Sequence, residues 1–139
     1  MIVLDTNVLS ALMQASPDRA VIEWLDRQPA ESVWTTAVTV FELRFGIELL
    51  PRGKRRRGLE TAFELALSED LEGRILVFDR AAALIAGGIA AARRRTGRSV
   101  EIRDTQIAAI VLERRATLAT RNVRHFRGLG LKLVDPWAA

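Results

Sequence analysis

The sequence has no cysteine, one histidine (His125) and only two lysines among its 139 residues. Without cysteine, the protein can build neither a disulfide framework nor a thiolate zinc site. The longest run of small apolar residues, 81–92, is glycine-interrupted and too short to span a bilayer, which takes roughly 20 residues. No secretory signal stands ahead of the first predicted strand. We therefore expect a cytoplasmic protein with no membrane segment and no sulfur-based metal centre.

What the sequence does contain is typical of one folded domain. Hydrophobic residues make up 49% and charged residues 27% of the chain, values found in globular rather than disordered proteins. We expect residues 1–139 to form a single domain with a substantial core. The net charge of +4 comes almost wholly from arginine, which suits bidentate contacts to phosphate. A solvated surface explains so small a charge equally well, so it does not by itself indicate a nucleic-acid partner.

The first seven residues are the motif around which the rest is organised. Residues 1–4 are an uninterrupted apolar run, which predicts a strand buried on both faces, and Asp5 ends it. Open α/β sheets place ligand sites at the carboxyl ends of their strands, so Asp5, Thr6 and Asn7 are candidate site residues. The same residue types are favoured helix N-caps, and on this segment alone the capping role is equally possible.

The remaining hydrophobic pattern predicts alternating helices and strands. Further strands are expected at 32–36, 74–78, 116–120 and 131–134. Helices are expected at 6–14, 18–27, 37–50, 59–71, 80–96 and 101–115. This order predicts an α/β fold in which helices cover both faces of a central, mostly parallel sheet of four to five strands.

Helix 37–50 carries an acidic residue close to its apolar face. Apolar residues recur in this helix at spacings of three and four and are expected to be buried: Val38, Phe41, Phe45 and Leu49. Glu42 lies beside this stripe. Because glutamate is rarely buried without a partner, its position suggests a neighbouring arginine or metal ion. A boundary position with the carboxylate in solvent is the simpler alternative.

Two arginine-rich segments have ordinary structural explanations. Residues 51–58 are expected to be a linker whose basic run includes Arg55 and Arg56. Such runs are usually solvated, and the alternative is a surface that follows phosphates. Residues 93–95 are three arginines that suit the negative end of the dipole of helix 80–96. The alanine- and glycine-rich middle of that helix permits close backbone approach, inside the core or across a dimer interface.

Three acidic residues from separate segments are expected at one edge of the sheet. Asp5 ends a strand, Glu42 follows the second strand, and Asp104 opens the helix that leads to the fourth. Two carboxylates about 4 Å apart repel by roughly 4 kcal/mol at an effective dielectric near 20. A hard divalent cation relieves such repulsion, and an all-oxygen ligand set favours Mg²⁺ or Mn²⁺. A site of this kind suits phosphoryl chemistry.

Four short motifs together resemble the PIN domain and, more narrowly, the VapC-type (FitB-like) toxins of bacterial toxin–antitoxin pairs. In order along the chain they are residues 2–7, residues 36–43, Asp104 with residues 107–109, and residues 119–122. The resemblance implies a compact α/β/α sandwich and a ribonuclease toxin that hydrolyses RNA phosphodiester bonds with Mg²⁺. It also implies a cognate antitoxin that inhibits the toxin, operator DNA bound only through that antitoxin, and a homodimer.

By position, three acids correspond to the catalytic and metal-binding residues of that family. The resemblance implies that Asp5 and Asp104 ligate Mg²⁺ and that Glu42 completes the site or positions the attacking water. Thr6 and Thr120 correspond to polar positions that orient these acids.

The sequence departs from the family pattern near the end of the fourth predicted strand. Asn122 stands where the family often has a fourth acid, and His125 stands where many relatives have aspartate. Asparagine still offers a neutral oxygen, so Asn122 and Asn7 are grouped with the supporting residues. The missing charge leaves open whether one or two metal ions bind. His125 is interpreted as a surface residue rather than a ligand.

Arginines near the site are expected to guide the RNA backbone: Arg121, Arg124, Arg55 and Arg56. Two other functions remain open. One is a catalytically weak PIN domain that acts mainly by binding its antitoxin and, through it, operator DNA, which the missing fourth acid favours. The other is a nucleotide-binding α/β domain, but no glycine-rich loop follows the first strand.

Overall fold

The structure is a computed structural model that describes all residues from Met1 to Ala139. The first half contains β1 (Ile2–Leu4), α1 (Thr6–Leu12), α2 (Arg19–Asp26), the 3-10 turn η1 (Ala30–Ser32), β2 (Val33–Thr36), α3 (Ala37–Leu49) and α4 (Lys54–Leu65). The second half contains the π-helical turn η2 (Ala66–Asp70), β3 (Ile75–Leu76), α5 (Arg80–Arg95), α6 (Ile102–Glu113), β4 (Thr117–Ala119), α7 (Val123–Phe126) and β5 (Lys132–Val134).

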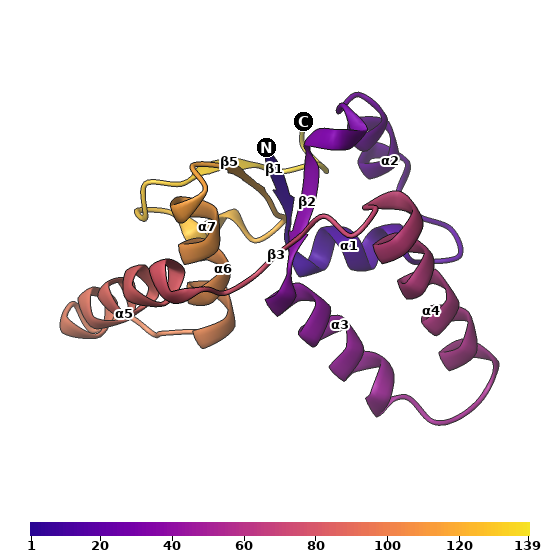
Figure 1. Ribbon diagram of the computed structural model, residues 1–139, viewed down its shortest axis with the longest axis horizontal. Helices are drawn as coiled ribbons and strands as arrows, with labels where there is room; N and C mark the ends of the chain where they lie inside the picture. Colours follow the sequence, from indigo (N-terminus) through magenta and orange to yellow (C-terminus); the bar gives the residue numbers. More distant parts are fainter.

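The five strands form one parallel sheet with β1 at its centre (Figure 1). The strand order is β3-β2-β1-β4-β5, and every neighbouring pair is parallel. In the register, Val3 lies opposite both Trp34 of β2 and Leu118 of β4. Because the carboxyl ends of parallel strands meet at one edge, Asp5 lies in the middle of that edge. The predicted fold class is confirmed, and the first strand, which the sequence predicts to be buried on both faces, is the central one.

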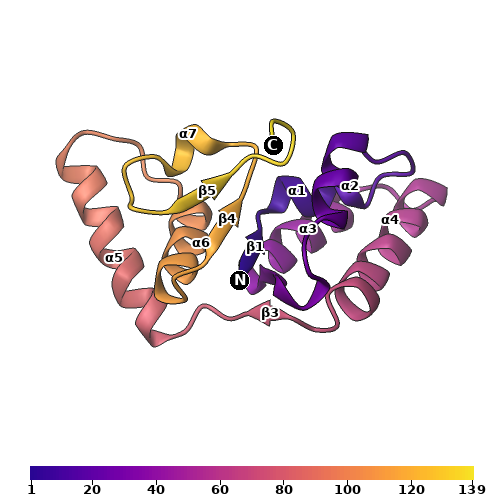
Figure 2. The same ribbon diagram turned by 90° about the horizontal axis from the view of Figure 1, so that it is seen from above.

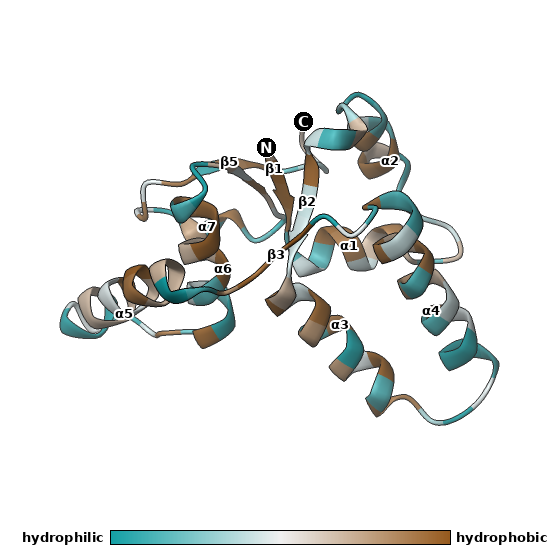
Figure 3. Cartoon of the chain, in the orientation of Figure 1, coloured by the Kyte–Doolittle hydropathy of each residue, from teal (hydrophilic) through white to brown (hydrophobic).

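Helices cover the sheet on both faces, as predicted (Figure 2). α1, α2, α3 and α4 lie on one side of β1, and α5, α6 and α7 lie on the other. Successive residues of a strand point to opposite faces, so Leu4 joins the core under the first group and Val3 joins the core under the second. Both are buried, at 1% and 0% exposure. The central strand β1 is accordingly apolar along its length (Figure 3).

The predicted buried face of α3 is largely wrong. Val38 is buried as expected, but Phe41, Phe45 and Leu49 are 57%, 49% and 70% exposed. The buried residues of the helix are instead Val38, Thr39, Leu43 and Ile47. Apolar residues lie on two faces of this helix, so periodicity alone did not identify the packed one. The Phe41 and Phe45 rings stack on each other in solvent, with centroids 6.1 Å apart.

The predicted linker at 51–58 is also partly wrong, because α4 begins at Lys54 and includes most of the basic run. Lysine and arginine are good helix formers, and Gly58 is tolerated within the helix at a cost of about 1 kcal/mol. The break between α3 and α4 falls at Pro51 and Gly53, whose backbone has φ 158°.

α5 begins directly after its N-cap Asp79, whose Oδ1 accepts the Ala82 N–H at 2.9 Å. Ala82 and Ala86 are buried in the core cluster that also includes the apolar face of α6. Side-chain atoms added at Gly87 or Gly88 would meet nothing within 4 Å, so no close contact within the chain explains this pair. None of the helices combines the length and the apolar character that crossing a membrane requires.

Candidate active site

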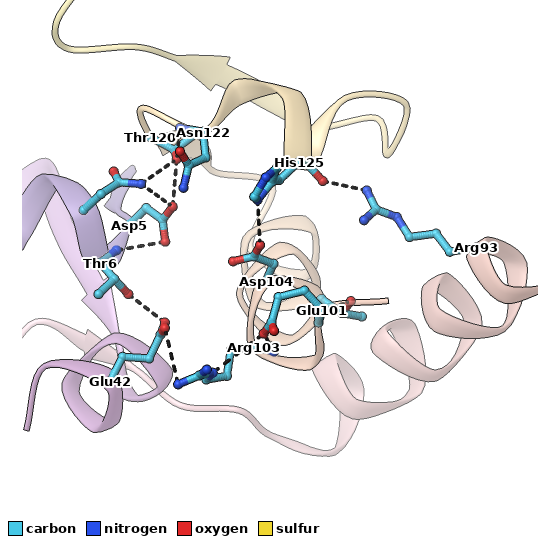
Figure 4. Close-up of polar contacts among 12 residues, drawn as sticks. Asp5, Thr6, Glu42, Arg93, Glu101, Arg103, Asp104, Thr120, Asn122 and His125 are labelled. Carbon is cyan, nitrogen blue, oxygen red and sulfur yellow. Dashed lines mark hydrogen bonds and ion pairs between the residues drawn. The ribbon is translucent and has the colours of Figure 1, made fainter. Parts of the chain in front are cut away.

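Asp5 lies at the centre of the site because it follows the central strand directly (Figure 4). Its backbone N–H donates to the Ala119 carbonyl at 2.9 Å, which extends the pairing of β1 with β4. One oxygen of its carboxylate accepts the Thr6 N–H at 2.8 Å and caps α1. The other oxygen accepts the Thr120 hydroxyl at 2.7 Å. Capping a helix and lying at the sheet edge, which the sequence posed as alternatives, are both true of Asp5.

The Asp5 carboxyl group is 3% exposed and resists ionisation. Burial raises its pKa from the ordinary 3.8 to about 6, because a charge is poorly solvated there. Hydrogen bonds from Thr120 and Thr6 oppose this rise, and the negative charges of Asp104 and Glu42 add to it. Ionisation of Asp5 therefore costs energy. The carboxylate is buried, and it is repelled by the nearby charges of Asp104 and Glu42.

Glu42 reaches the site from α3 through a network of threonine hydroxyls. The Thr6 hydroxyl donates to Glu42 Oε1 at 2.8 Å and lies 3.1 Å from Thr39 Oγ1. The start of α3 is fixed by Thr36, whose Oγ1 accepts the Thr39 N–H at 3.1 Å. The Glu42 side chain is 22% exposed, so it lies at the boundary of the core. It also has the bonding partners that the sequence offered as the alternative to a boundary position. Thr6 thus joins the loop after β1 to the acid of α3.

Arg103 lies beside Glu42 and was not predicted from the sequence. Its Nη1 is 3.8 Å from Glu42 Oε2, and its Nε is 3.7 Å from Glu101 Oε1. Glu101 Oε1 also accepts the Arg103 backbone N–H at 2.7 Å and so caps α6. A positive side chain in the first turn of a helix is unfavourable, because it opposes the helix dipole. This unfavourable position was the only feature of the sequence that could have drawn attention to Arg103.

Asp104 enters the site from the first turn of α6 and contacts α7. Its Oδ2 is 3.1 Å from His125 Nδ1, with 21% of the Asp104 and 59% of the His125 side chain exposed. The single turn α7 follows β4 and brings His125 over the end of α6 (Figure 4). His125 is thus a surface residue, as interpreted from the sequence, and it is also a direct neighbour of a site acid.

The acids share one edge of the sheet without collapsing onto a single point. No three histidine, aspartate or glutamate side chains are close enough together to hold one metal ion in their present positions. Glu42 is turned toward Thr6 and Arg103, and Asp104 is turned toward His125. The donors that surround the space between them are carboxylate oxygens, the ligands that hard divalent cations prefer. This donor chemistry fits Mg²⁺, and binding through all three acids would require Glu42 to rotate away from Arg103 or Asp104 to rotate away from His125.

The predicted supporting residues meet around Asp5. Thr120 Oγ1 accepts the Asn122 backbone N–H at 3.0 Å and lies 3.4 Å from Asn7 Nδ2. Asn7 Nδ2 is also 3.4 Å from Asp5 Oδ2, and Asn7 Oδ1 accepts the Arg121 N–H at 3.1 Å. These bonds fix the turn after β4 against the start of α1, so Thr120 is held with its hydroxyl toward the Asp5 carboxylate.

The four predicted RNA-binding arginines are not gathered at the site. Arg124 lines a cavity that Asp104 also lines. Arg121 stacks on the Trp137 ring, with its guanidinium carbon 4.7 Å from the ring centroid. Arg55 and Arg56 lie in the first turn of α4, which follows α3 in the chain, and the 13 residues of α3 extend about 20 Å from the sheet edge.

Comparison with known proteins identifies the family. Residues 2–130 match the PIN domain. The VapC ribonuclease Y4jK of Sinorhizobium fredii is 40% identical over 137 residues, which is 99% of this chain and 98% of that protein. The toxin FitB of Neisseria gonorrhoeae is 36% identical over 137 residues, 99% of each chain. The structure of FitAB bound to an IR36 DNA fragment contains a chain with a TM-score of 0.87 and 35% identity, covering 99% of this chain and 96% of that one. The chain therefore belongs to the PIN domain family.

Proposed function

We propose that this protein is the Mg²⁺-dependent ribonuclease toxin of a type II toxin–antitoxin system and hydrolyses RNA phosphodiester bonds. The observation that carries the proposal is the buried Asp5, whose pKa is raised by burial and further by the charges of Asp104 and Glu42. One perturbed acid with two further acids nearby, at the carboxyl edge of a parallel sheet, is typical of a functional site. Relatives named as a VapC ribonuclease and a FitB toxin support the substrate and the biological role.

Each acid has a separate task in this proposal. Asp5 and Asp104 hold the Mg²⁺, which when bound supplies an activated water and neutralises charge on the phosphate. Asp5 is oriented for this by the Thr6 N–H and the Thr120 hydroxyl, both of which favour its charged form. Glu42, held by Thr6, completes the site or orients the attacking water.

The proposal includes an antitoxin that binds the toxin and joins it to operator DNA. The FitAB structure, which contains DNA, supports this arrangement. It also includes a homodimer, because the exposed row of Phe41, Phe45 and Leu49 on α3 is an apolar surface that water solvates poorly.

Cleavage of RNA by the antitoxin-free protein tests the enzymatic proposal. We expect Mg²⁺ to support cleavage, EDTA to abolish it, and Asp5→Asn or Asp104→Asn to reduce it about 100-fold or more. Asp26→Asn is the matched control, since Asp26 is exposed at the end of α2. Equal cleavage by wild type and Asp5→Asn would remove Asp5 from the mechanism. A wild-type protein that binds its antitoxin in EDTA and cleaves no RNA would instead be the binding-only domain that the absent fourth acid favours.

A further inference from the structure

A cavity of about 670 Å³ adjoins the site and is lined mainly by charged side chains. It lies between the end of α5, the loop that leads to α6, and α7, and Asp104 and His125 form the wall that it shares with the site. The site's function does not account for four other lining residues: Arg93, Arg98, Arg124 and Arg127. A volume of this size is within the range of small-ligand sites.

The charge in this cavity is not balanced within the chain. Glu101 and Asp104 are its only acids, and each already has a cationic or histidine neighbour, Arg103 and His125. Among the four arginines, only Arg93 makes a side-chain hydrogen bond, from Nη2 to the His125 carbonyl at 2.7 Å. The cavity is therefore a cluster of uncompensated guanidinium groups, which attract an anion.

Arg93 is fixed at the wall of the cavity by one hydrogen bond and has a second, buried donor without a partner. Its hydrogen bond to the His125 carbonyl joins the end of α5 to α7. The sequence suggested only an interaction with the dipole of its own helix, so Arg93 has a second role. Its Nε is buried without a hydrogen-bond partner. A buried N–H without an acceptor is energetically unfavourable, and an anionic oxygen supplies the missing acceptor.

We infer that this cavity holds a backbone phosphate of the RNA strand, next to the phosphodiester that is cleaved. This inference rests on the proposed ribonuclease function. A strand whose reacting phosphate lies at Asp104 continues past it with one negative charge per nucleotide, and the adjoining wall presents guanidinium groups. Arginine matches phosphate oxygens bidentately. The cavity has one hydrophobic lining residue, Val100, and no Phe or Trp on which a base could stack. Contacts of this kind, to phosphate rather than to base edges, position the strand without reading its sequence.

The double variant Arg98→Ala/Arg127→Ala tests the inference, because neither side chain makes an ion pair or hydrogen bond that folding needs. Its matched control is Arg94→Ala/Arg95→Ala, which removes the same charge from the nearby end of α5, outside the cavity. Binding of a ten-nucleotide RNA is measured by fluorescence anisotropy in EDTA at several salt concentrations, and cleavage is measured with Mg²⁺.

We expect the cavity variant to bind RNA about tenfold more weakly and to lose about 0.7 from the slope of log K against log salt, the value for one phosphate contact on a single strand. Its KM should rise while kcat and the cleavage positions stay the same. Equal changes in the cavity variant and the control would overturn the inference. If the wild type cleaves RNA and the cavity variant has an unchanged KM, only the cavity assignment fails. If the wild type cleaves no RNA, the proposed function itself fails.

Competitors distinguish the sources of the anion. Inorganic phosphate and a ten-residue glutamate peptide are added to the RNA-binding assay. Weak competition by both, at concentrations far above that of the RNA, supports an RNA phosphate. Tight inorganic phosphate binding that the cavity variant lacks would overturn it in favour of a free-anion site. Competition by the peptide at RNA-like concentrations would overturn it in favour of an acidic protein segment.

Discussion

Replacing Asp5 by asparagine is expected to stabilise the fold near neutral pH. The folded protein raises the pKa of Asp5 from 3.8 to about 6, so the native state binds this proton more tightly than the unfolded chain does. The resulting stabilisation is complete below about pH 4 and is lost as the pH rises through 6. At 1.36 kcal/mol per pKa unit, the loss is at most about 3 kcal/mol. Asparagine carries no charge at any pH and avoids this loss.

The size of the effect depends on which hydrogen bonds survive. Asparagine Oδ1 keeps the bond from the Thr6 N–H, while its amide group faces the Thr120 hydroxyl, which has to turn and accept. Allowing about 1 kcal/mol for this adjustment leaves a net gain of about 2 kcal/mol at pH 7. For a chain of this length, that gain raises the Tm by about 6 °C.

Denaturant unfolding in EDTA, repeated from pH 4 to pH 8, measures this effect. The wild type should lose stability between pH 4 and pH 6 relative to Asp5→Asn. At the acidic end, where only the adjustment of about 1 kcal/mol separates them, the wild type should be the more stable. Mg²⁺ at 100 times its dissociation constant should then stabilise the wild type by about 2.7 kcal/mol and reverse the order, because the variant lacks the ligand. The exposed control Asp26→Asn should stay within about 0.5 kcal/mol of wild type. An Asp5→Asn protein that is less stable in EDTA at pH 7, or that shows the wild-type pH slope, would refute this reasoning.

Three further changes address neighbouring residues. Arg103→Ala removes the cation 3.8 Å from Glu42 and should tighten Mg²⁺ binding about fivefold in a thermal-shift titration, whereas weaker binding would contradict competition at that carboxylate. Thr6→Val loses the 2.8 Å bond to Glu42 and should lower kcat about tenfold with little effect on unfolding; an unchanged kcat would show that Glu42 needs no anchor. Phe45→Glu places a charge in the exposed row on α3 and should give a monomer by light scattering that still cleaves RNA, and a persistent dimer would locate the interface elsewhere.

The sequence predicted the framework of the site better than its surroundings. The apolar run that ends at Asp5 fixes a central strand, because few other arrangements bury residues 2–4 on both faces. Glu42 and Asp104 could be assigned to the same edge as Asp5 because both lie in helices that begin at that edge. These predictions depend on strand order and periodicity, which a single sequence displays.

Packing between elements could not be predicted in the same way. Phe41, Phe45 and Leu49 are as apolar as a core face, and only the position of α1 and α4 decides that Leu43 and Ile47 are buried instead. Arg103 and Arg93 were missed for a related reason. Their partners, Glu42 and the His125 carbonyl, are distant in sequence, so no local pattern connects them.

The central place of β1 also affects when activity arises during synthesis. Asp5 is synthesised before the residues that complete its surroundings: its strand needs residues 117–119 beside it, and its carboxylate needs the Thr120 hydroxyl. Both come from the last quarter of the chain. A nascent or prematurely terminated product that ends before β4 lacks one wall of the catalytic edge. Under the proposed function, a product that ends before β4 should therefore lack ribonuclease activity.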